Sequence, residues 1–94
     1  MAIYRITRFT SQDMNKAIAM ADAARDEIAT VGADFIDVAA DDDGNGVVVA
    51  RYPDSATMEA ATPVAQKVFG QMIAEGVMDG ESVDIWTGDV VNSM

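Results

Sequence analysis

"DFIDVAADDDGNGVVVARY", residues 34–52, holds two strand-like runs on either side of an acidic, glycine-rich segment. Both runs are short, β-branched or alternating, and bounded by Gly and Asp, which is typical of strands. Gly44 and Gly46 tolerate positive φ, and Asn45 does so more readily than most residues. We therefore predict a hairpin with its centre at Asp43 or Gly44, an odd-length turn that pairs odd with odd residues across the two strands.

The same stretch matches the first half of a calcium-binding loop, because Asp41, Asp43, Asn45 and Gly46 follow a D-x-D-x-N-G spacing. Such a loop needs a bidentate Glu at its twelfth position and helices on both sides. The twelfth position here is Tyr52, and the flanks are strand-like. The pattern indicates a turn and no dedicated metal site, and leaves open whether Asp41–Asp43 attract a cation weakly from solvent.

Upstream of the hairpin, residues 3–9 alternate in polarity and predict a strand. Thr10 or Ser11 could cap a helix with Asp13 in its first turn, and Gly32 suits its left-handed C-terminus. One apolar stripe runs along this predicted helix: Met14, Ala17, Ile18, Ala21, Ala24, Ile28 and Val31.

Downstream, Pro53 ends the strand, and Asp54 or Ser55 caps a second helix that Pro63 is expected to interrupt and Gly76 to end. Its stripe comprises Met58, Ala61, Ala65, Phe69, Met72 and Ile73. Residues 81–88 predict the last strand, followed by a short tail.

The predicted order is β-α-β-β-α-β over one domain, residues 1–94, which is the pattern of a ferredoxin-like α+β sandwich. It implies a four-stranded antiparallel sheet with the second and fourth strands at its edges and both helices on one face.

The amino-acid composition excludes several kinds of active site and binding partner. The chain has no Cys and no His, so it lacks a thiolate nucleophile, Cys or His metal ligands and the usual neutral-pH general base. Its net charge of −10 disfavours nucleic acid and anionic membranes as partners. No signal peptide or membrane span is evident, so we expect a cytoplasmic protein.

Strand alternation divides the sheet residues into two sets. The apolar set is expected to pack under the helices: Tyr4, Ile6, Ile36, Val38, Ala40, Val48, Ala50, Tyr52, Val83 and Ile85. The mixed set is expected on the outer face: Ile3, Arg5, Thr7, Phe9, Phe35, Asp37, Ala39, Val47, Val49, Arg51, Ser82, Asp84 and Trp86. That outer face, of roughly 400 Å², is too apolar to stay exposed. We therefore predict a homodimer through this face, burying about 800 Å² per chain.

"RITRFT", "VVVARYPDSATMEAA" and "GESVDIWTGDVV" (residues 5–10, 47–61 and 80–91), together with length and element order, make the chain similar to the dimeric α+β barrel superfamily. That group includes antibiotic-biosynthesis-monooxygenase-like domains. The resemblance implies a ferredoxin-like fold, a barrel closed across a dimer, and apolar or aromatic ligands bound between sheet and helices or inside the barrel. Members that degrade haem rely on a His, which is missing here, so no catalytic residue carries over.

The candidate ligand-binding residues lie on the predicted outer face: Arg5, Thr7, Phe35, Arg51, Asp84 and Trp86. The arginines could hold an oxyanion, or pair as Arg5–Asp84 and Arg51–Asp37. Trp86 could stack on a ligand, but a large aromatic residue more often anchors an interface.

Three functions remain open. The first is a small protein that binds an apolar or aromatic ligand without metal or organic cofactor. The second is a cofactor-free monooxygenase or isomerase acting on an enolisable aromatic substrate, with Arg5 or Arg51 stabilising the anion. The third is a purely structural dimer without a ligand.

Overall fold

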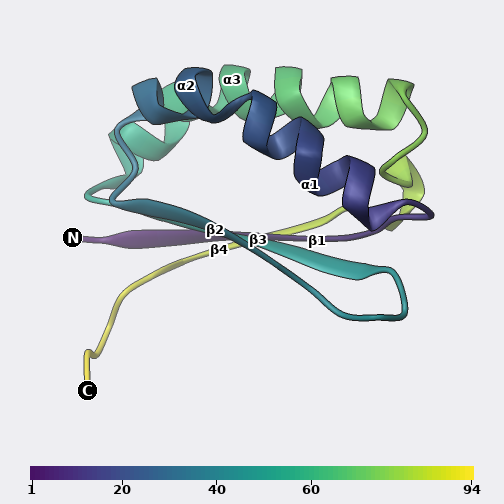
Figure 1. Cartoon of the computed structure of the whole chain (residues 1–94). Coiled ribbons are helices and arrows are strands. Elements are labelled where there is room, and N and C mark those ends of the chain that lie inside the picture. The colour runs from purple at the N-terminus through teal and green to yellow at the C-terminus, as the bar shows by residue number, and fades with distance from the viewer.

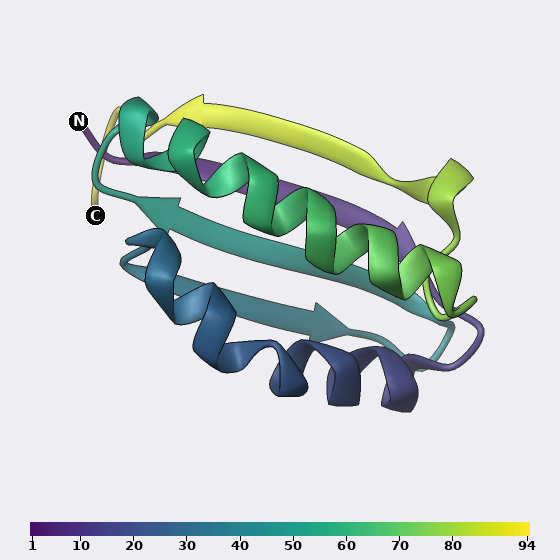
Figure 2. The same cartoon turned by 90° about the horizontal axis from the view of Figure 1, so that it is seen from above.

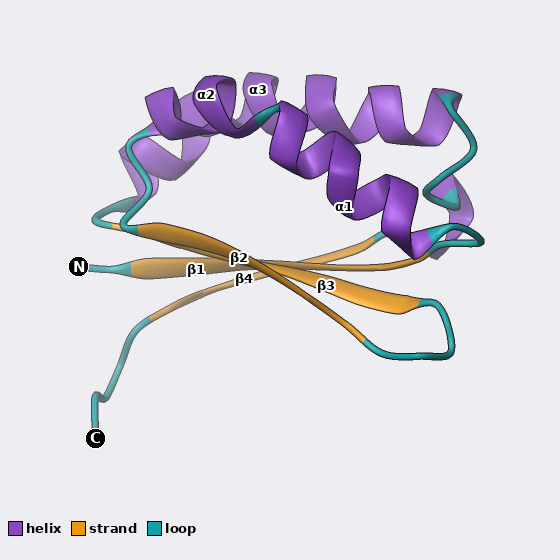
Figure 3. Cartoon of the chain, in the orientation of Figure 1, coloured by secondary structure: helices purple, strands orange, loops and turns teal.

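The computed structural model describes residues 1–94 and contains a four-stranded antiparallel sheet with a layer of helices on one side (Figures 1 and 3). The strand order is β2-β3-β1-β4. The predicted ferredoxin-like order is therefore confirmed, with the second and fourth strands at the sheet edges.

The elements have the following bounds. The strands are β1 (Ile3–Thr10), β2 (Phe35–Ala40), β3 (Asn45–Tyr52) and β4 (Asp84–Asp89). The helices are α1 (Met14–Ala23), α2 (Arg25–Ile28) and α3 (Ser55–Ala74), with short 3₁₀ helices η1 (Ala29–Val31) and η2 (Gly80–Ser82). The last strand begins three residues later than predicted, because η2 occupies its expected start.

The acidic segment is a hairpin turn, as predicted. Ala40 pairs with Gly46, which places the centre of the turn at Asp43. The Asp41 carboxylate accepts hydrogen bonds from the backbone N–H groups of Asp43 and Asn45 and from the Asn45 side-chain amide. The Asn45 side-chain bond is the main cause that holds the pKa of Asp41 below its ordinary value. This carboxylate thus organises the turn itself.

The helices depart from prediction in three details. The N-cap of α1 is Asp13, whose carboxylate accepts from the Lys16 N–H, so neither Thr10 nor Ser11 caps it. The first helix is broken at Ala24 into α1 and α2. Pro63 does not interrupt α3. It is exposed, so the hydrogen bond that it removes lies on the side of the helix where water can replace it.

The face assignment of β1 was wrong. Ile3, Arg5, Thr7 and Phe9 stand opposite Tyr52, Ala50, Val48 and Gly46 of β3, and all of these residues face the helices. Tyr4, Ile6 and Arg8 therefore lie on the outer face. The assignments of β2, β3 and β4 agree with prediction: Ile36 and Val38 pair with Ala50 and Val48, and Ile85 pairs with Thr7.

The contact between Phe9 and Gly46 explains why the odd-numbered residues of β1 face the helices. A Cβ atom added at Gly46 would lie 2.5 Å from the Phe9 ring, so the ring occupies the space that the glycine leaves open. Phe9 is buried, and Ile3 is buried at the other end of the strand. Arg5 and Thr7 lie on the same side of the strand as Ile3 and Phe9. Burial of the two ends therefore places Arg5 and Thr7 under the helices as well.

The helices do not cover the whole sheet. Viewed from above, α3 runs over the central strands, α1 and α2 follow the β2 edge, and β4 has no helix above it (Figure 2). Ile85 on the helix side of β4 is accordingly 57% exposed. No helix in the protein is long and apolar enough to cross a membrane.

The core consists of two separate clusters. One contains Phe9, Ala17, Val68, Met72, Val77 and Met78, and the other contains Ile3, Ala50, Tyr52 and Ala61. A cavity lies against both clusters.

Candidate functional site

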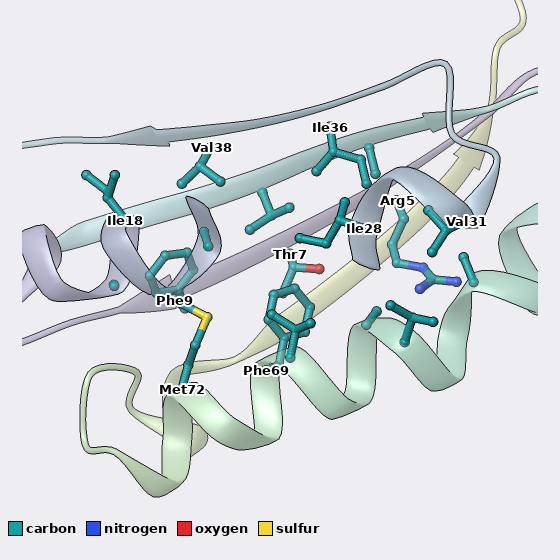
Figure 4. A pocket seen from close by; sticks show the side chains of 18 of the residues that line it. Arg5, Thr7, Phe9, Ile18, Ile28, Val31, Ile36, Val38, Phe69 and Met72 are labelled. Atoms are coloured by element: carbon teal, nitrogen blue, oxygen red, sulfur yellow. The ribbon is translucent and has the colours of Figure 1, made fainter. Parts of the chain in front are cut away.

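The cavity lies between the helix layer and the sheet and has a volume of about 80 Å³. Residues of three strands and of all the helices above them line the cavity: β1, β2, β3, α1, α2, η1 and α3. Eighteen of the twenty lining residues are hydrophobic. Figure 4 shows Phe9, Ile18 and Met72 toward one end and Arg5 and Val31 toward the other. The space is therefore elongated, with an apolar end and an end that contains one cation.

Small side chains create this space. Both helices face the sheet with alanines at helical spacing, and a further alanine lies below them on β3. These residues are Ala17, Ala21, Ala50, Ala61 and Ala65. Each methyl group fills less volume than the Leu or Ile usual in a core, so helices and sheet meet without filling the space between them.

Arg5 is the only charged residue in the wall. Its Nη2 donates to the Met58 carbonyl and to Thr62 Oγ1, both at 2.8 Å. Its guanidinium carbon lies 5.7 Å from the centre of the Tyr52 ring, which is within the range of a cation–π contact. These contacts hold the cation between the sheet and α3.

Thr7 and Tyr52 supply the remaining polar groups. Thr7 is 1% exposed, and Figure 4 shows its hydroxyl directed into the cavity. Burial raises the pKa of the Tyr52 phenol, and the positive charge of Arg5 offsets part of that rise. The wall of the cavity thus includes a guanidinium and a hydroxyl, which can donate hydrogen bonds to an oxygen atom of a ligand, and a neutral tyrosine beside the guanidinium.

The structure separates the six candidate residues into two groups. Arg5 and Thr7 line the cavity. The other four lie on the outer face: Phe35, Arg51, Asp84 and Trp86. Each is paired in the sheet with a residue of that face. Arg51 stands opposite Phe35 and Tyr4, Asp84 stands opposite Arg8, and Trp86 stands opposite Ile6. The six residues therefore do not form one pocket.

The predicted charge pairs are wrong for the same reason. Arg5 and Asp84 lie on opposite faces, and the residue opposite Asp84 is Arg8. Arg51 makes its salt bridge with Asp34, at 3.5 Å, and not with Asp37. Of the two tyrosines expected to face the helices, only Tyr52 does so, while Tyr4 packs edge-to-face against Phe35 on the outer face, with ring centres 6.1 Å apart.

Two further predictions concern the helix stripes. The stripe of α1 and α2 is confirmed, since every member except Ala24 lines the cavity and Ala24 packs against the core. The stripe of α3 omitted Val64 and Val68, which also line the cavity, and included Ile73, which is exposed.

The opening of the cavity is marked by residues that line it and also reach solvent. Ile18 of α1 is 47% exposed and Val38 of β2 is 42% exposed. β2 is an edge strand and α1 follows that edge (Figure 2), so we infer from the exposure of these two residues that the cavity opens on this side. The resemblance implied ligands between sheet and helices, but the candidate residues were chosen on the predicted outer face, although the alanines of the two stripes were a signal for a cavity under the helices.

No family model matches this sequence, and no curated protein matches it either. Its fold, however, is shared with solved structures. SnoaB, a cofactor-independent oxygenase from Streptomyces nogalater, superposes with a TM-score of 0.80 at 12% identity, covering 99% of this chain and 96% of its own. The monooxygenase from the gene ActVA-Orf6 of Streptomyces coelicolor, solved with the ligand nanaomycin D, gives a TM-score of 0.75 at 13% identity and covers 99% and 90%.

A dimeric ferredoxin-like protein of unknown function from Jannaschia gives a TM-score of 0.66 at 14% identity, covering 96% of this chain and 100% of its own. At these identities the similarity concerns the fold. The predicted resemblance to antibiotic-biosynthesis-monooxygenase-like, ferredoxin-like proteins is confirmed at that level.

Proposed function

We propose that this protein binds a small apolar or aromatic molecule in the cavity between its helices and its sheet. The observation that carries the proposal is the wall of the cavity, which is hydrophobic except for Arg5 and Thr7. Ligand pockets commonly combine a mostly apolar lining with a few placed polar groups that fix the orientation of the ligand. The relevant pocket is therefore on the helix side of the sheet, and not on the outer face where the sequence suggested it.

The volume restricts the ligand. At about 80 Å³ the cavity is smaller than the space of about 150 Å³ that holds benzene in an engineered protein. Binding of a single ring therefore requires the wall to widen. The α1 helix is the element best able to move, since Ala17 is its only buried residue and the chain breaks regular helix directly after it, at Ala24.

Proteins of the same fold support the proposal. One of them was solved with nanaomycin D bound, and another is a cofactor-independent oxygenase. Both cover nearly the whole of this chain. The fold is thus compatible with small organic ligands and with chemistry that needs no cofactor.

Filling the cavity tests the proposal. Toluene is titrated into the protein while NMR follows the methyl groups of the cavity. Ala65→Leu places a larger side chain in the wall and should weaken toluene binding at least about tenfold, with stability unchanged or raised. Ala60→Leu is the matched control, because Ala60 is exposed on the same helix. If toluene binds Ala65→Leu as tightly as wild type, or if neither toluene nor a ring compound with a polar group perturbs the cavity methyl groups, the cavity is not a binding site and the purely structural dimer is favoured.

We further propose a homodimer through the outer face. Trp86 is 58% exposed and Phe35 is 38% exposed, and Ile6 and Val49 lie between them on the central strands. A second copy placed over this surface would bury about 800 Å² per chain, the size of a standard stable interface. The Jannaschia protein of the same fold is dimeric, which supports this assembly.

Light scattering tests the dimer. Trp86→Lys should convert the protein to a folded 10.0 kDa monomer, because a charge would be buried in the interface. Ile73→Lys is the control, since Ile73 is a similarly exposed hydrophobic residue on the helix layer and should leave the dimer intact. A wild-type protein that is monomeric at micromolar concentration contradicts the proposal.

A second candidate function is cofactor-free oxygenation of an enolisable aromatic substrate, and the observation that favours it is the guanidinium of Arg5 in an apolar cavity. In such a reaction one oxygen atom of O₂ becomes a carbonyl oxygen of the product, the other leaves as water, and the substrate supplies the electrons. Arg5 would stabilise the substrate anion. Oxygen consumption with an enolisable aryl ketone such as anthrone, whose CH₂ group can become a carbonyl, should be lost in Arg5→Met and retained in Arg51→Met, whose arginine lies on the outer face. Equal activity in both variants excludes this role of Arg5.

A further inference from the structure

The charge of Arg5 is not compensated within the protein. The four salt bridges use Lys16, Arg25, Arg51 and Lys67. Although the chain has sixteen acidic residues, none of them lines the cavity. Arg5 is instead bonded to a carbonyl and a hydroxyl, both neutral. A half-buried cation without an anionic partner is unfavourable unless a partner arrives from outside.

The geometry of Arg5 leaves donors available. Its two hydrogen bonds to α3 both come from Nη2. A guanidinium has five N–H donors, and no hydrogen bond within the chain uses Nε or Nη1. Both bidentate edges of a guanidinium include Nη2, so the free Nε and Nη1 groups donate separately, each to one oxygen atom of a ligand.

The surroundings of Arg5 define the rest of the ligand. In Figure 4 the guanidinium lies at one end of the cavity, the Thr7 hydroxyl lies further along, and Phe69 and Phe9 follow toward the other end. A molecule with its charge at Arg5 would thus place its apolar body among aliphatic and aromatic side chains.

We propose that Arg5 is the specificity-determining residue of the cavity and selects apolar ring compounds that carry an anionic oxygen, either a carboxylate or an ionised phenol or enol. This inference rests on the proposed binding function and specifies its ligand class. Arg5 serves as the anchor for the oxyanion, and the Nη2 bonds to α3 fix the directions of its free Nε and Nη1 donors before the ligand arrives. Pre-organisation of this kind lowers the entropic cost of binding.

The test compares benzoate with benzamide, which have nearly the same shape but differ in charge. Both are titrated by NMR into the wild-type protein, Arg5→Met, Arg5→Gln and Arg51→Met. The wild type and Arg51→Met should prefer benzoate at least about tenfold. Both Arg5 variants should lose that preference while still binding benzamide. Arg5→Gln keeps an N–H donor for the Met58 carbonyl, so it remains informative if Arg5→Met fails to fold.

The outcomes separate the two proposals. If benzamide binds wild type as tightly as benzoate, or if the preference survives in Arg5→Gln, the anion selectivity of Arg5 is refuted while the binding function stands. If neither compound nor toluene perturbs the cavity methyl groups, the binding function itself fails. Replacing benzoate by 4-nitrophenolate distinguishes a carboxylate site from a phenolate or enolate site, since the tighter of the two identifies the preferred oxyanion.

Discussion

The helix-covered face and the outer face of the sheet contain similar numbers of apolar residues but use them differently. Under the helices, Phe9 and Tyr52 are each 3% exposed and surround a cavity. On the outer face, Trp86 and Phe35 remain open to solvent. The helices of the chain thus cover the first face apart from β4 and a central cavity, whereas no part of the chain covers the outer face.

The strand β1 shows what this difference means. Each of the two sets of β1 contains two large hydrophobic residues and one arginine, so burial of apolar residues alone does not decide between them. The structure buries the set with Ile3 and Phe9, and so leaves a cation in an apolar cavity and Tyr4 and Ile6 on the outer face. Both consequences disfavour the isolated chain, and an anionic ligand inside with a second copy outside would remove both.

The largest expected difference between the faces concerns two phenylalanines. Phe9→Ala removes a buried ring that contacts the core and should lower the free energy of unfolding by about 3–5 kcal/mol. Phe35→Ala removes a partly exposed ring whose edge-to-face contact with Tyr4 contributes about 1 kcal/mol. Urea unfolding at protein concentrations low enough to give the monomer measures both. An equal loss in the two variants would mean that the outer face is also part of the folding core of the monomer.

Alanine substitutions of two glycines, one on each face of the sheet, should have smaller effects on stability. A methyl group at Gly46 would meet the buried Phe9 ring, and one at Gly88 would meet the exposed Trp86 ring. The Phe9 ring is buried and packs against the core, so displacing it in Gly46→Ala should cost about 1–3 kcal/mol. The Trp86 ring can turn toward solvent, so Gly88→Ala should change the unfolding free energy by about 0.5 kcal/mol or less.

Thermal or urea unfolding of Gly46→Ala and Gly88→Ala measures which substitution lowers the stability more. If Gly88→Ala is the more destabilising substitution, the Trp86 ring is held in place on the outer face, and the description of that face as open is wrong.

The smallest predicted effect is a titration. Burial raises the pKa of Tyr52 above its ordinary value of 10.0, and the Arg5 guanidinium lowers it in part. Because the folded state favours the neutral phenol, the stability that it contributes is complete below the unfolded pKa and is lost as the pH rises through the folded pKa. In a Tyr4→Phe background the absorbance of tyrosinate reports Tyr52 alone. Arg5→Met should shift that titration to higher pH, and Arg51→Met should leave it unchanged. A shift to lower pH in Arg5→Met would show that the cation does not act on the phenol.

Much of the fold could be predicted from local patterns. The strand alternation of residues 34–52, the stripe on α1 and the left-handed glycine Gly32, with φ of 77°, are local properties and appear in the structure as expected. The break at Ala24 was missed, because the apolar spacing continues through it although the helix does not.

The candidate site was predicted less well. The residue types were informative, since Arg5 and Thr7 do line a cavity, but they were grouped with Trp86 and Asp84 from the opposite face. A strand with two partly apolar sets has no local feature that decides which set is buried. In β1 both sets contain large hydrophobic residues and one arginine.

The amino-acid sequence by itself determined the element order, the hairpin and the apolar stripe of the first helix, and it limited the cap of α3 to Asp54 or Ser55, because each depends on residues a few positions apart. Tertiary structure alone decided the face of β1 and with it the position of Arg5, because that choice depends on how the Phe9 ring meets Gly46 across two strands. A shift of one residue in that contact would exchange the cavity residues for those of the outer face.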